Sequence, residues 1–468
     1  MKPILQKLFG SVCLLLLGIV SLAQPLKQFK KGERVVFVGN SITDGGHYHS
    51  YIWLYYMTHF PGRRIDVFNA GIGGDIAMQI NDRLETDVFV HKPTIITLTF
   101  GMNDTGYGEY LRENAKEFAD KRVQQSFASY QLIEKKLQNY TGARKMMIAS
   151  SPYDETSKIK TRALIGKNDA LLRVASFQEE SAKKNQWEFL DFNRSMVAIN
   201  LREQKKDTLF TLCGQDRIHP ANDGHFVMAY LFLKQQGLSG LKVSAIEVDA
   251  AGTKILNAEN CQLSNLRKTG STFSFDYLSN SLPYPIDTVA RGGSGGMSSK
   301  KQSDALNIIP FMEEFNTESL LVKGLKESSE YRVKIDSTVI GKWTGAELSK
   351  GVNLATITTT PQYQQALSIM QMNEERWEIE RRLREYYWLH YSILTRKGLL
   401  FNDNESTMDS VRLYARRDPF VRGVINTYQK ARFPAVREAW KKQIALITDQ
   451  IYSVNGPKKR RIIIELIP

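Results

Sequence analysis

The chain has 468 residues, of which 42% are hydrophobic and 24% charged, and its formal net charge is +14. This length predicts two to four structural units, and the apolar fraction excludes bulk disorder. Most of the basic excess is dispersed, with one dense patch at Lys458–Arg461. Such dispersion is typical of a solvated surface, and attraction to an acidic polysaccharide is the alternative interpretation.

The first 23 residues are typical of a secretory signal peptide. Lys2 and Lys7 precede the apolar run Leu8–Val20, and the small residues that end at Ala23 predict cleavage before Gln24. That run is too short to span a membrane as a helix, and no later stretch is apolar over enough length. We therefore expect an exported chain, periplasmic or extracellular, with no integral membrane segment. Because it has no recognisable nucleic-acid-binding motif, no nucleic-acid partner is expected.

Residues 24–240 are expected to form an α/β domain, because short apolar runs alternate with longer amphipathic segments from Arg34 to about Gly240. The expected strands are Arg34–Val38, Ile65–Asn69, Thr94–Phe100, Lys145–Ser150 and Trp187–Leu190. The expected helices are Ile76–Val90, Tyr110–Asn139, Leu164–Lys184 and Asn222–Gln236. Most of the strands are continuous apolar runs, as expected when both faces of a sheet are covered. The pattern predicts a three-layer α/β/α sandwich with a parallel sheet.

Residues 241–360 change in character and predict a small β-rich accessory domain. The expected strands, which are separated by Gly, Ser and Asn turns, are Lys242–Val248, Phe273–Tyr277, Ser319–Val322 and Tyr331–Ile335. The glycine-rich stretch Arg291–Met297 predicts a flexible loop.

Residues 361–468 predict a helical extension that ends in a strand. Tyr363–Arg396 and Phe420–Tyr452 carry apolar residues at helical spacing, and the Phe433-Pro434 pair should bend or break the second helix. The aromatic residues along the first helix are typical of a packing face. The final segment, Arg461–Ile467, predicts one strand that docks on an earlier sheet.

Four short segments carry the chemistry, and each follows an expected strand or lies in a late loop. They are Gly39–Thr43, Asn69–Asp75, Gly101–Asp104 and Asp216–Pro220. Ser41 comes directly after the first strand, at the carboxyl edge of the sheet, where open α/β folds place their ligands. Alone, such a serine is typical of a helix N-cap. In combination with the other segments, it is the expected nucleophile.

A serine nucleophile needs a base that is oriented by a carboxylate. Among the seven histidines, only His219 has an acid three residues before it and a proline directly after. That acid, Asp216, lies in a tight turn that can aim it at one ring nitrogen and leave the other for Ser41. His225 is the alternative base, but it falls in the expected helix after Asn222, where a capping or packing role is favoured.

The oxyanion formed in acyl transfer needs preorganised donors. Gly74 lets a backbone N–H approach the substrate without a Cβ in the way, and Asn103 offers its side-chain amide. The Ser41 N–H is the third expected donor of this oxyanion hole.

These segments resemble the four blocks of the SGNH (GDSL-type) esterase superfamily. The four residues of its name fall on Ser41, Gly74, Asn103 and His219, with Asp216 as the third triad member. The resemblance covers about Arg34 to Gly240 and implies a flavodoxin-like hydrolase fold and a serine ester hydrolase of the acetylesterase type. One residue departs from the pattern: Asn40 stands where the motif has Asp, outside the catalytic relay. The lack of a Gly-x-Ser-x-Gly elbow argues against the α/β-hydrolase superfamily.

The expected substrate is an acylated poly- or oligosaccharide, with O-acetyl as the first choice of acyl group, because export and two accessory regions resemble bacterial polysaccharide-processing esterases. A lipase or acyl-thioesterase of the same superfamily is an alternative, disfavoured because no apolar lid lies beside the motifs. Four aromatic residues follow Ser41 closely and would either flank a sugar or, as we favour, pack a helix on the sheet. They are Tyr48, Tyr51, Trp53 and Tyr55.

A glycan-binding module and a glycosidase on the same scaffold are further alternatives. A glycosidase needs two carboxylates, and Asp44, Asp75 and Asp104 lie near the motifs, where they are interpreted as turn and supporting residues. The histidines are scattered and no Cys-x-x-Cys pair is present, so neither a metal site nor a cofactor is expected. For Cys213 and Cys261, burial as small apolar residues is favoured over a single disulfide. The oligomeric state is left open.

Overall fold

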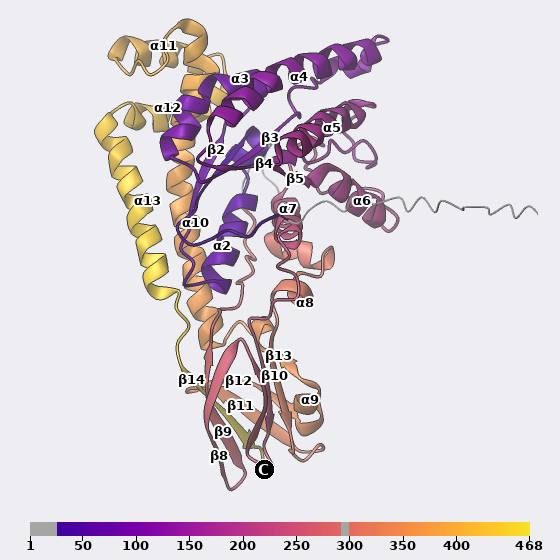
Figure 1. Cartoon of the computed structure of the whole chain (residues 1–468), viewed down its shortest axis with the longest axis vertical. Helices are drawn as coiled ribbons and strands as arrows, with labels where there is room; N and C mark the ends of the chain where they lie inside the picture. Colours follow the sequence, from indigo (N-terminus) through magenta and orange to yellow (C-terminus); the bar gives the residue numbers. More distant parts are fainter. Residues whose placement is uncertain (1–25, 292–298) are drawn as a thin grey trace, which may run out of the picture.

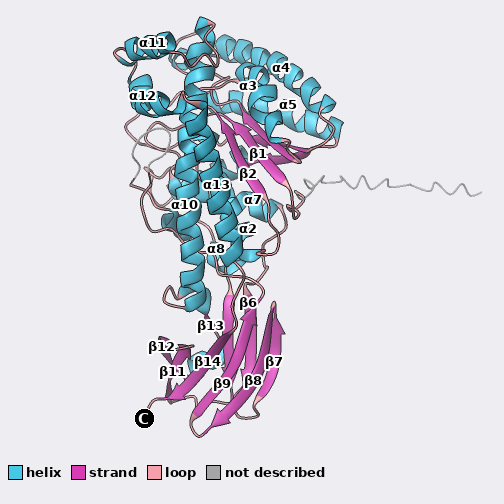
Figure 2. Ribbon diagram, turned by 90° about the vertical axis from the view of Figure 1, so that its left-hand side faces the viewer, coloured by secondary structure: helices cyan, strands magenta, loops and turns pink. Residues whose placement is uncertain are grey.

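The computed structural model describes residues 26–291 and 299–468. The predicted signal peptide and all but the first residue of the predicted Arg291–Met297 loop lie outside these ranges. The described chain is elongated, with an α/β domain in the upper half of Figure 1 and a β-sandwich at the lower end. Two long helices run along one side of the α/β domain and reach down toward the sandwich (Figures 1 and 2).

The α/β domain is built on one sheet of five parallel strands in the order β2-β1-β3-β4-β5. These strands are β1 (Arg34–Gly39), β2 (Asp66–Gly71), β3 (Ile95–Phe100), β4 (Arg144–Ala149) and β5 (Glu188–Asp191). Each expected strand lies within two residues of the observed one at both ends. The predicted parallel α/β fold is therefore confirmed.

Two apolar cores lie on opposite faces of this sheet. Because side chains alternate along a strand, Val35 and Phe37 of β1 enter one core, and Val36 and Val38 enter the other. The first core also contains residues from α2 (Tyr48–His59), α6 (Phe192–Gln204) and α7 (Asn222–Gln235). The second contains residues from α3 (Ala77–Arg83), α4 (Ala115–Asn139) and α5 (Lys167–Asn185). The result is the three-layer sandwich.

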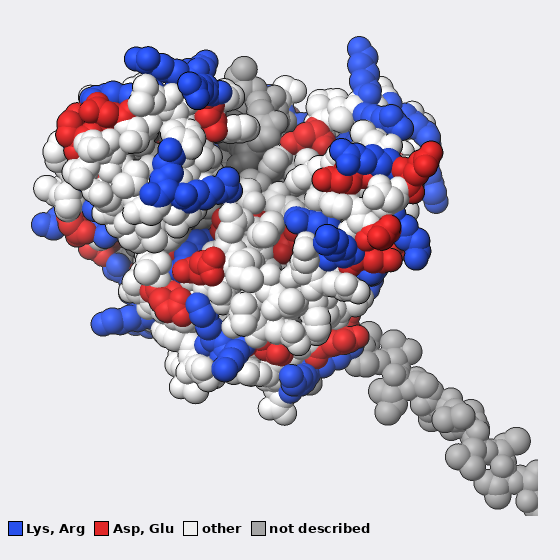
Figure 3. All heavy atoms as spheres, turned by 90° about the horizontal axis from the view of Figure 1, so that it is seen from above, with Lys and Arg blue, Asp and Glu red and all other residues white. Residues whose placement is uncertain are grey.

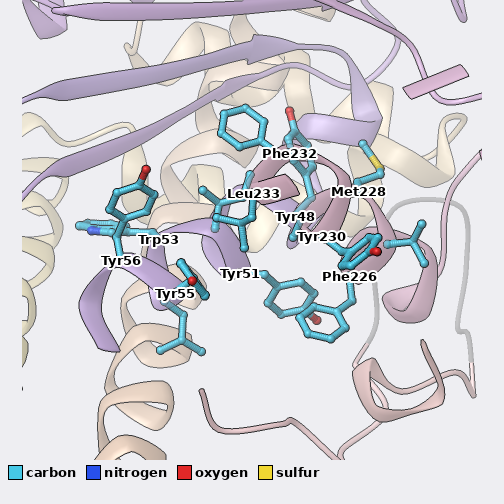
Figure 4. Close-up of a cluster of buried hydrophobic side chains, with 14 of the residues drawn as sticks. Tyr48, Tyr51, Trp53, Tyr55, Tyr56, Phe226, Met228, Tyr230, Phe232 and Leu233 are labelled. Carbon is cyan, nitrogen blue, oxygen red and sulfur yellow. The ribbon is translucent and has the colours of Figure 1, made fainter. Parts of the chain in front are cut away.

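The aromatic residues that follow Ser41 pack in the first core (Figure 4). Tyr48, Tyr51, Trp53 and Tyr55 of α2 are each at most 2% exposed. The ring of Tyr51 meets that of Phe226 from α7 edge to face, with centroids 5.7 Å apart. Their burial favours the packing role and leaves no face of these rings for a sugar.

Helix ends in this domain depart from the expected ranges where loops fold back on the sheet. The expected helix Ile76–Val90 is α3 followed by a π-helical turn, Leu84–Val88, and a 3-10 turn. Helix α4 begins at Ala115 rather than Tyr110, because the Tyr110 hydroxyl donates to the Thr105 carbonyl, 2.8 Å away, and ties that segment to the preceding loop. Helix α6 was not expected.

The β-sandwich consists of a four-stranded sheet, β13-β10-β6-β7, and a five-stranded sheet, β12-β11-β14-β9-β8. The strands between residues 244 and 353 are β6 (Ser244–Asp249), β7 (Lys254–Glu259), β8 (Cys261–Thr269), β9 (Thr272–Ser279), β10 (Glu318–Lys323), β11 (Glu330–Ile335), β12 (Thr338–Thr344) and β13 (Val352–Asn353). Two short helices, α8 (Phe311–Phe315) and α9 (Gly345–Lys350), interrupt them. Residues from both sheets, including Ile246 and Phe275, share one core. Strands β7, β8, β12 and β13 were not predicted from the sequence, and every residue of β7 is exposed.

The last strand, β14 (Arg460–Leu466), lies in the middle of the five-stranded sheet. It pairs antiparallel with β9 on one side and with β11 on the other. The predicted terminal strand and its docking on an earlier sheet are confirmed, and the sandwich is complete only when the end of the chain has joined it.

The long helices belong to a helical part formed by α10 (Pro361–Trp388), α11 (Glu405–Ala415), α12 (Pro419–Ala431) and α13 (Pro434–Val454). Helix α10 starts with Thr360, whose hydroxyl accepts from the Tyr363 N–H, and with Pro361 in its first turn. The break predicted at Phe433-Pro434 is confirmed, since α12 ends two residues before that pair and α13 begins with its proline. The expected first helix ends at Trp388 and continues as a π-helical turn, Leu389–Leu394, and α11 was not expected.

Cys213 and Cys261 are free and buried, as favoured from the sequence. In the described ranges, no helix combines the length and the apolar character that crossing a membrane requires.

Candidate active site

Ser41, His219 and Asp216 lie in one hydrogen-bonded row at the carboxyl edge of the sheet. Ser41 is the first residue of the short helix α1 (Ser41–Asp44), which starts directly after β1. Its Oγ lies 2.8 Å from His219 Nε2, and His219 Nδ1 lies 2.6 Å from Asp216 Oδ2. Asn40 caps α1, since its Oδ1 accepts from the Ile42 N–H, so it supports the turn and lies outside this row. The structure thus brings Ser41 together with Asp216 and His219, the two predicted partners that lie 175 or more positions later in the chain.

The turn from Asp216 to His219 holds the imidazole by short-range hydrogen bonds. Asp216 Oδ1 accepts from the backbone N–H groups of Ile218 and His219, at 2.9 and 3.0 Å. Arg217 has a left-handed φ of 66° and is buried, and its guanidinium donates to carbonyl oxygens that include that of Asp154. Burial acts to raise the pKa of Asp216, but the bonds from His219 and the backbone outweigh it and lower that pKa. The carboxylate is therefore ionised at neutral pH.

The expected oxyanion donors border the same space as Ser41. Gly74 has a φ of +88°, a left-handed conformation that a residue with a Cβ rarely adopts, and a Cβ there would still meet no neighbour within 4 Å. The preceding Gly73 N–H is already used, since it donates to Asp44 Oδ2 at 3.2 Å. Among the described residues, the Gly74 N–H has no hydrogen-bond partner, so it is available to a ligand.

The Asn103 amide is fixed by two neighbours. Its Oδ1 accepts from the Tyr107 hydroxyl at 2.6 Å, and its Nδ2 donates to the Asp75 carbonyl at 3.0 Å. The Asp75 carbonyl can only accept, so its bond fixes which end of the amide carries the nitrogen, and the second Nδ2 hydrogen stays free of these two bonds. The Lys167 ammonium lies 4.0 Å from the centre of the Tyr107 ring. Tyr107 was missed in the sequence, although its place four residues after Asn103 was the one available signal.

The three acids near the motifs have different surroundings. Asp75 is buried and accepts from Arg83 Nε at 2.7 Å, and Asp104 accepts from the backbone N–H groups of Gly101 and Ala77. Both act as supporting residues, as interpreted from the sequence. Asp44 differs because it lines the pocket beside Ser41. Burial raises the pKa of Asp44 to about 6, against the attraction of nearby arginines.

A pocket of about 600 Å³ opens in front of this row, and it has two walls. The motif wall consists of Ser41, Gly74, Asn103 and His219. The helical wall consists of Glu385 and Trp388 of α10 and Phe420 and Val424 of α12. The sequence analysis found no apolar segment beside the motifs, and the apolar wall in fact comes from residues far along the chain.

Comparisons with known proteins identify the family of this chain. The family model for the GDSL-like lipase/acylhydrolase family matches residues 37–226. The solved structure of a gut microbial diltiazem-metabolizing enzyme is 48% identical, covers 95% of this chain and 100% of its own, and superimposes with a TM-score of 0.91. The chain belongs to the GDSL-like lipase/acylhydrolase family. It is therefore an ester hydrolase.

Two further matches each cover only one part of this chain. The model for the diltiazem deacetylase C-terminal helical domain matches residues 367–456, a range that contains the whole helical wall. Acetylxylan esterase from Geobacillus stearothermophilus is 24% identical over 233 residues, which are 97% of that enzyme but 45% of this chain. The chain is thus similar to one relative over 95% of its length and to another over less than half.

Helix α10 also holds the turn that carries Gly74. Arg384 donates to the Gly71 carbonyl through Nε at 3.1 Å and Nη2 at 2.9 Å, and Trp388 Nε1 donates to the Gly73 carbonyl at 3.1 Å. Arg384 also forms two bonds of 2.8 Å with Asp87, which Arg83 contacts from the other side at 2.6 Å. Burial acts to raise the pKa of Asp87, but the two arginines outweigh it and hold that pKa at about 2. These buried contacts join the helical part to the site.

His225 lies away from this row. It is buried in α7, and its ring stacks on that of Tyr48 with centroids 6.1 Å apart. Within residues 26–291 and 299–468, no group of three or more His, Cys, Asp or Glu side chains is placed to hold a metal ion.

Proposed function

We propose that this ester hydrolase is a serine esterase that removes acetyl groups through Ser41, His219 and Asp216. The observation that carries the proposal is the row of two short hydrogen bonds, Ser41 Oγ to His219 Nε2 and His219 Nδ1 to Asp216 Oδ2, beside an open pocket. Such a row gives the hydroxyl a base in reach, and it gives that base a carboxylate that fixes its tautomer.

Acyl transfer would proceed in two steps. Ser41 Oγ bonds to the ester carbonyl carbon while its proton passes to His219 Nε2, and the carbonyl π electrons move to the oxygen. The proton then passes from His219 to the departing alkoxide, the C–O bond breaks, and acetyl remains on Ser41. Water repeats the sequence on the acetyl-enzyme and releases acetic acid. Ionised Asp216 stabilises the imidazolium in both steps.

The oxyanion would bind to the Ser41 N–H, the Gly74 N–H and the Asn103 amide. Each such donor contributes about 3 kcal/mol to transition-state stabilisation in other serine hydrolases. The unpartnered Gly74 N–H and the fixed Asn103 amide support this assignment, because donors that are already oriented need no reorganisation during the reaction.

For the substrate, we propose an O-acetylated carbohydrate as the first candidate. Similarity to an acetylxylan esterase supports it, as does the pairing of aromatic side chains with carboxylates in the pocket. Aromatic rings pack on the apolar faces of sugars, and carboxylates accept hydrogen bonds from sugar hydroxyls.

A second candidate is an aromatic acetyl ester such as diltiazem. Similarity over 95% of the chain to a diltiazem-metabolizing enzyme favours it, together with the match of the helical part to a diltiazem deacetylase domain. Trp388 and Phe420 would then pack against the aromatic rings of the substrate. The same apolar wall is compatible with a lipase or acyl-thioesterase, so acyl chain length belongs in the test.

The test compares wild type with Ser41→Ala on three substrates. We expect acetate release from p-nitrophenyl acetate, acetylated xylan and diltiazem to fall at least 1,000-fold, while circular dichroism stays unchanged, because the nucleophile is lost. Turnover that survives in the variant would overturn the role of Ser41. Release of reducing sugar in place of acetate would favour the glycosidase alternative, and binding without turnover would favour the glycan-binding alternative. Comparison of acetyl with octanoyl esters separates a lipase.

We further propose that the mature enzyme is exported and begins at Gln24. The apolar run and small residues before that position support this proposal. N-terminal sequencing of protein from the periplasm and the medium tests it, and intact Met1 on active enzyme would contradict it.

A further inference from the structure

The pocket carries charges of the opposite sign to the chain as a whole. The chain has a net charge of +14, and lysines and arginines are spread among carboxylates over the face seen in Figure 3. Three carboxylates line the pocket, those of Asp44, Asp216 and Glu385, and of the described residues that line it none is a lysine or arginine. The charged side chains that line the pocket are therefore acidic, apart from His219, whereas the chain as a whole is basic.

The charge of Asp44 is not cancelled by the arginines behind it. Arg83 and Arg384 are bound within 2.6–2.8 Å of Asp75 and Asp87, so the two arginines are matched by two carboxylates. Asp44 is the third carboxylate of this buried cluster, and among the described residues its side chain has one hydrogen-bond partner, the Gly73 N–H. The cluster thus leaves one negative charge, and it lies at the pocket.

The part of the pocket lining that comes from α10 and α12 combines a carboxylate with aromatic rings. Glu385 is hydrogen-bonded to Arg381 on the same helix, and its side chain is 17% exposed. Trp388 and Phe420 line the pocket beside it, and Phe420 is 74% exposed at the start of α12. Aromatic rings next to carboxylates form the usual binding site for an alkylammonium group, because the ring faces and the carboxylates both attract positive charge.

We propose that the pocket selects acetyl esters whose alcohol part carries an ammonium group. The ammonium group would lie against Trp388 and Phe420, between Asp44 and Glu385, while the acetyl group reaches Ser41. Esters of acidic alcohols, uronic acids included, would be excluded by the same carboxylates. The proposal rests on the proposed role of Ser41 and adds the charge class of the substrate to it.

The experiment compares three acetyl esters of similar size: acetylcholine, its uncharged carbon analogue 3,3-dimethylbutyl acetate, and the anionic 2-acetoxyethanesulfonate. We expect kcat/KM for acetylcholine to exceed that of the uncharged analogue about tenfold, since one ammonium–aromatic contact with partial desolvation gives a preference of that order. The anionic ester should fall about tenfold below the uncharged one. Tetramethylammonium chloride should raise the KM for p-nitrophenyl acetate, whereas equal sodium chloride should not.

Two variants locate the selectivity. Asp44→Asn keeps an oxygen for the Gly73 N–H but removes the charge. Glu385→Gln likewise removes the charge and keeps an oxygen for Arg381. Each should lower the ratio of acetylcholine to 3,3-dimethylbutyl acetate about threefold or more. The matched control is Glu378→Gln on the same helix, because Glu378 also bonds to Arg381 but lies outside the pocket lining. The ratio in that control should equal the wild-type ratio.

The outcomes separate the two proposals. Turnover of p-nitrophenyl acetate with an acetylcholine ratio of one or less would overturn the charge selectivity and leave the esterase proposal standing. No turnover of any ester by folded wild-type enzyme would overturn the esterase proposal and the selectivity with it. If Asp44→Asn fails to fold, the tetramethylammonium experiment on wild type decides.

Discussion

The two walls of the pocket are built in different ways. His219 and Asn103 of the motif wall are held in part by near neighbours in the chain: Asp216 accepts from the N–H groups of Ile218 and His219, and Tyr107 donates to Asn103. The helical wall depends on contacts across the chain, since Arg384 reaches the Gly71 carbonyl over 313 positions. The side chains of the proposed acyl-transfer reaction therefore lie in short segments of the sequence. The side chains of the helical wall, which would contact the alcohol part of the ester, are placed by tertiary packing.

The largest loss of kcat should follow from removal of Asn103, the proposed oxyanion donor that its near neighbour Tyr107 holds. Asn103→Ala removes the donor and should lower kcat for p-nitrophenyl acetate about 100- to 1,000-fold. Tyr107→Phe keeps the ring beneath Lys167 but removes one of the two bonds that hold the amide, so kcat should fall by roughly tenfold with little change in KM. Steady-state kinetics on both variants measures this.

Tyr130→Phe is the matched control, because it removes a hydroxyl that is hydrogen-bonded to Ser181 in the core behind the sheet, away from the pocket. It should leave kcat per folded molecule unchanged. A Tyr107→Phe enzyme with wild-type kcat would show that the Asn103 amide needs no such support, and the local construction of the motif wall would then be wrong.

A smaller loss of activity is expected when the long-range anchor of the helical wall is removed. Arg384→Met leaves the Gly71 carbonyl without its two donors and Asp87 with one arginine instead of two. Breaking a buried ion pair of this kind costs about 3–5 kcal/mol of unfolding free energy. Because the turn that carries Gly74 is loosened, kcat/KM should also fall about threefold to tenfold. Urea unfolding and kinetics at a temperature where the variant is folded measure the two effects.

The same substitution at the surface provides the control. Arg412 is 46% exposed and pairs with Glu405 and Asp409 on α11, so Arg412→Met should change the unfolding free energy far less than Arg384→Met and leave kinetics unchanged. If Arg384→Met loses stability but keeps wild-type kcat/KM, the helical part supports the fold alone and not the Gly74 turn.

The parallel sheet and the row of Ser41, His219 and Asp216 were predictable because their signals are local. Buried strands are continuous apolar runs, and each member of the row stands in a short segment of typical composition. Glu385 and Phe420 had no such signal. Helix α10 carries both polar and apolar residues on all of its sides, because it packs against the α/β domain, α12 and α13. The sequence therefore did not distinguish the residues of this helix that line the pocket. The middle position of β14 in its sheet depends on strand pairing over more than 120 residues, which no local pattern encodes.

The smallest effect on activity is expected at Glu318, where β10 of the sandwich meets the first turn of α10. Glu318 is fully buried, and its Oε1 accepts from the Tyr277 hydroxyl at 2.8 Å and from Gln362 Nε2 at 2.9 Å. Burial raises the pKa of Glu318 to about 7, against these two hydrogen bonds, from an ordinary value of 4.5. Between pH 4.5 and 7, the Glu318 carboxyl is therefore protonated in the folded state and ionised in the unfolded state.

Because the folded pKa is the higher one, this group makes unfolding easier as the pH rises through that window, by a total on the order of 3 kcal/mol. Glu318→Gln cannot lose a proton, so the difference in unfolding free energy between variant and wild type should shift in favour of the variant from pH 4.5 to 7 and stay constant above pH 7. Urea unfolding at four pH values measures this, and kcat/KM should stay at the wild-type value, since the sandwich lies at the far end of α10 from the pocket (Figure 1). A parallel loss of kcat/KM would show that the sandwich acts on the site through α10, and the contrast between the two walls would then extend along the whole helix.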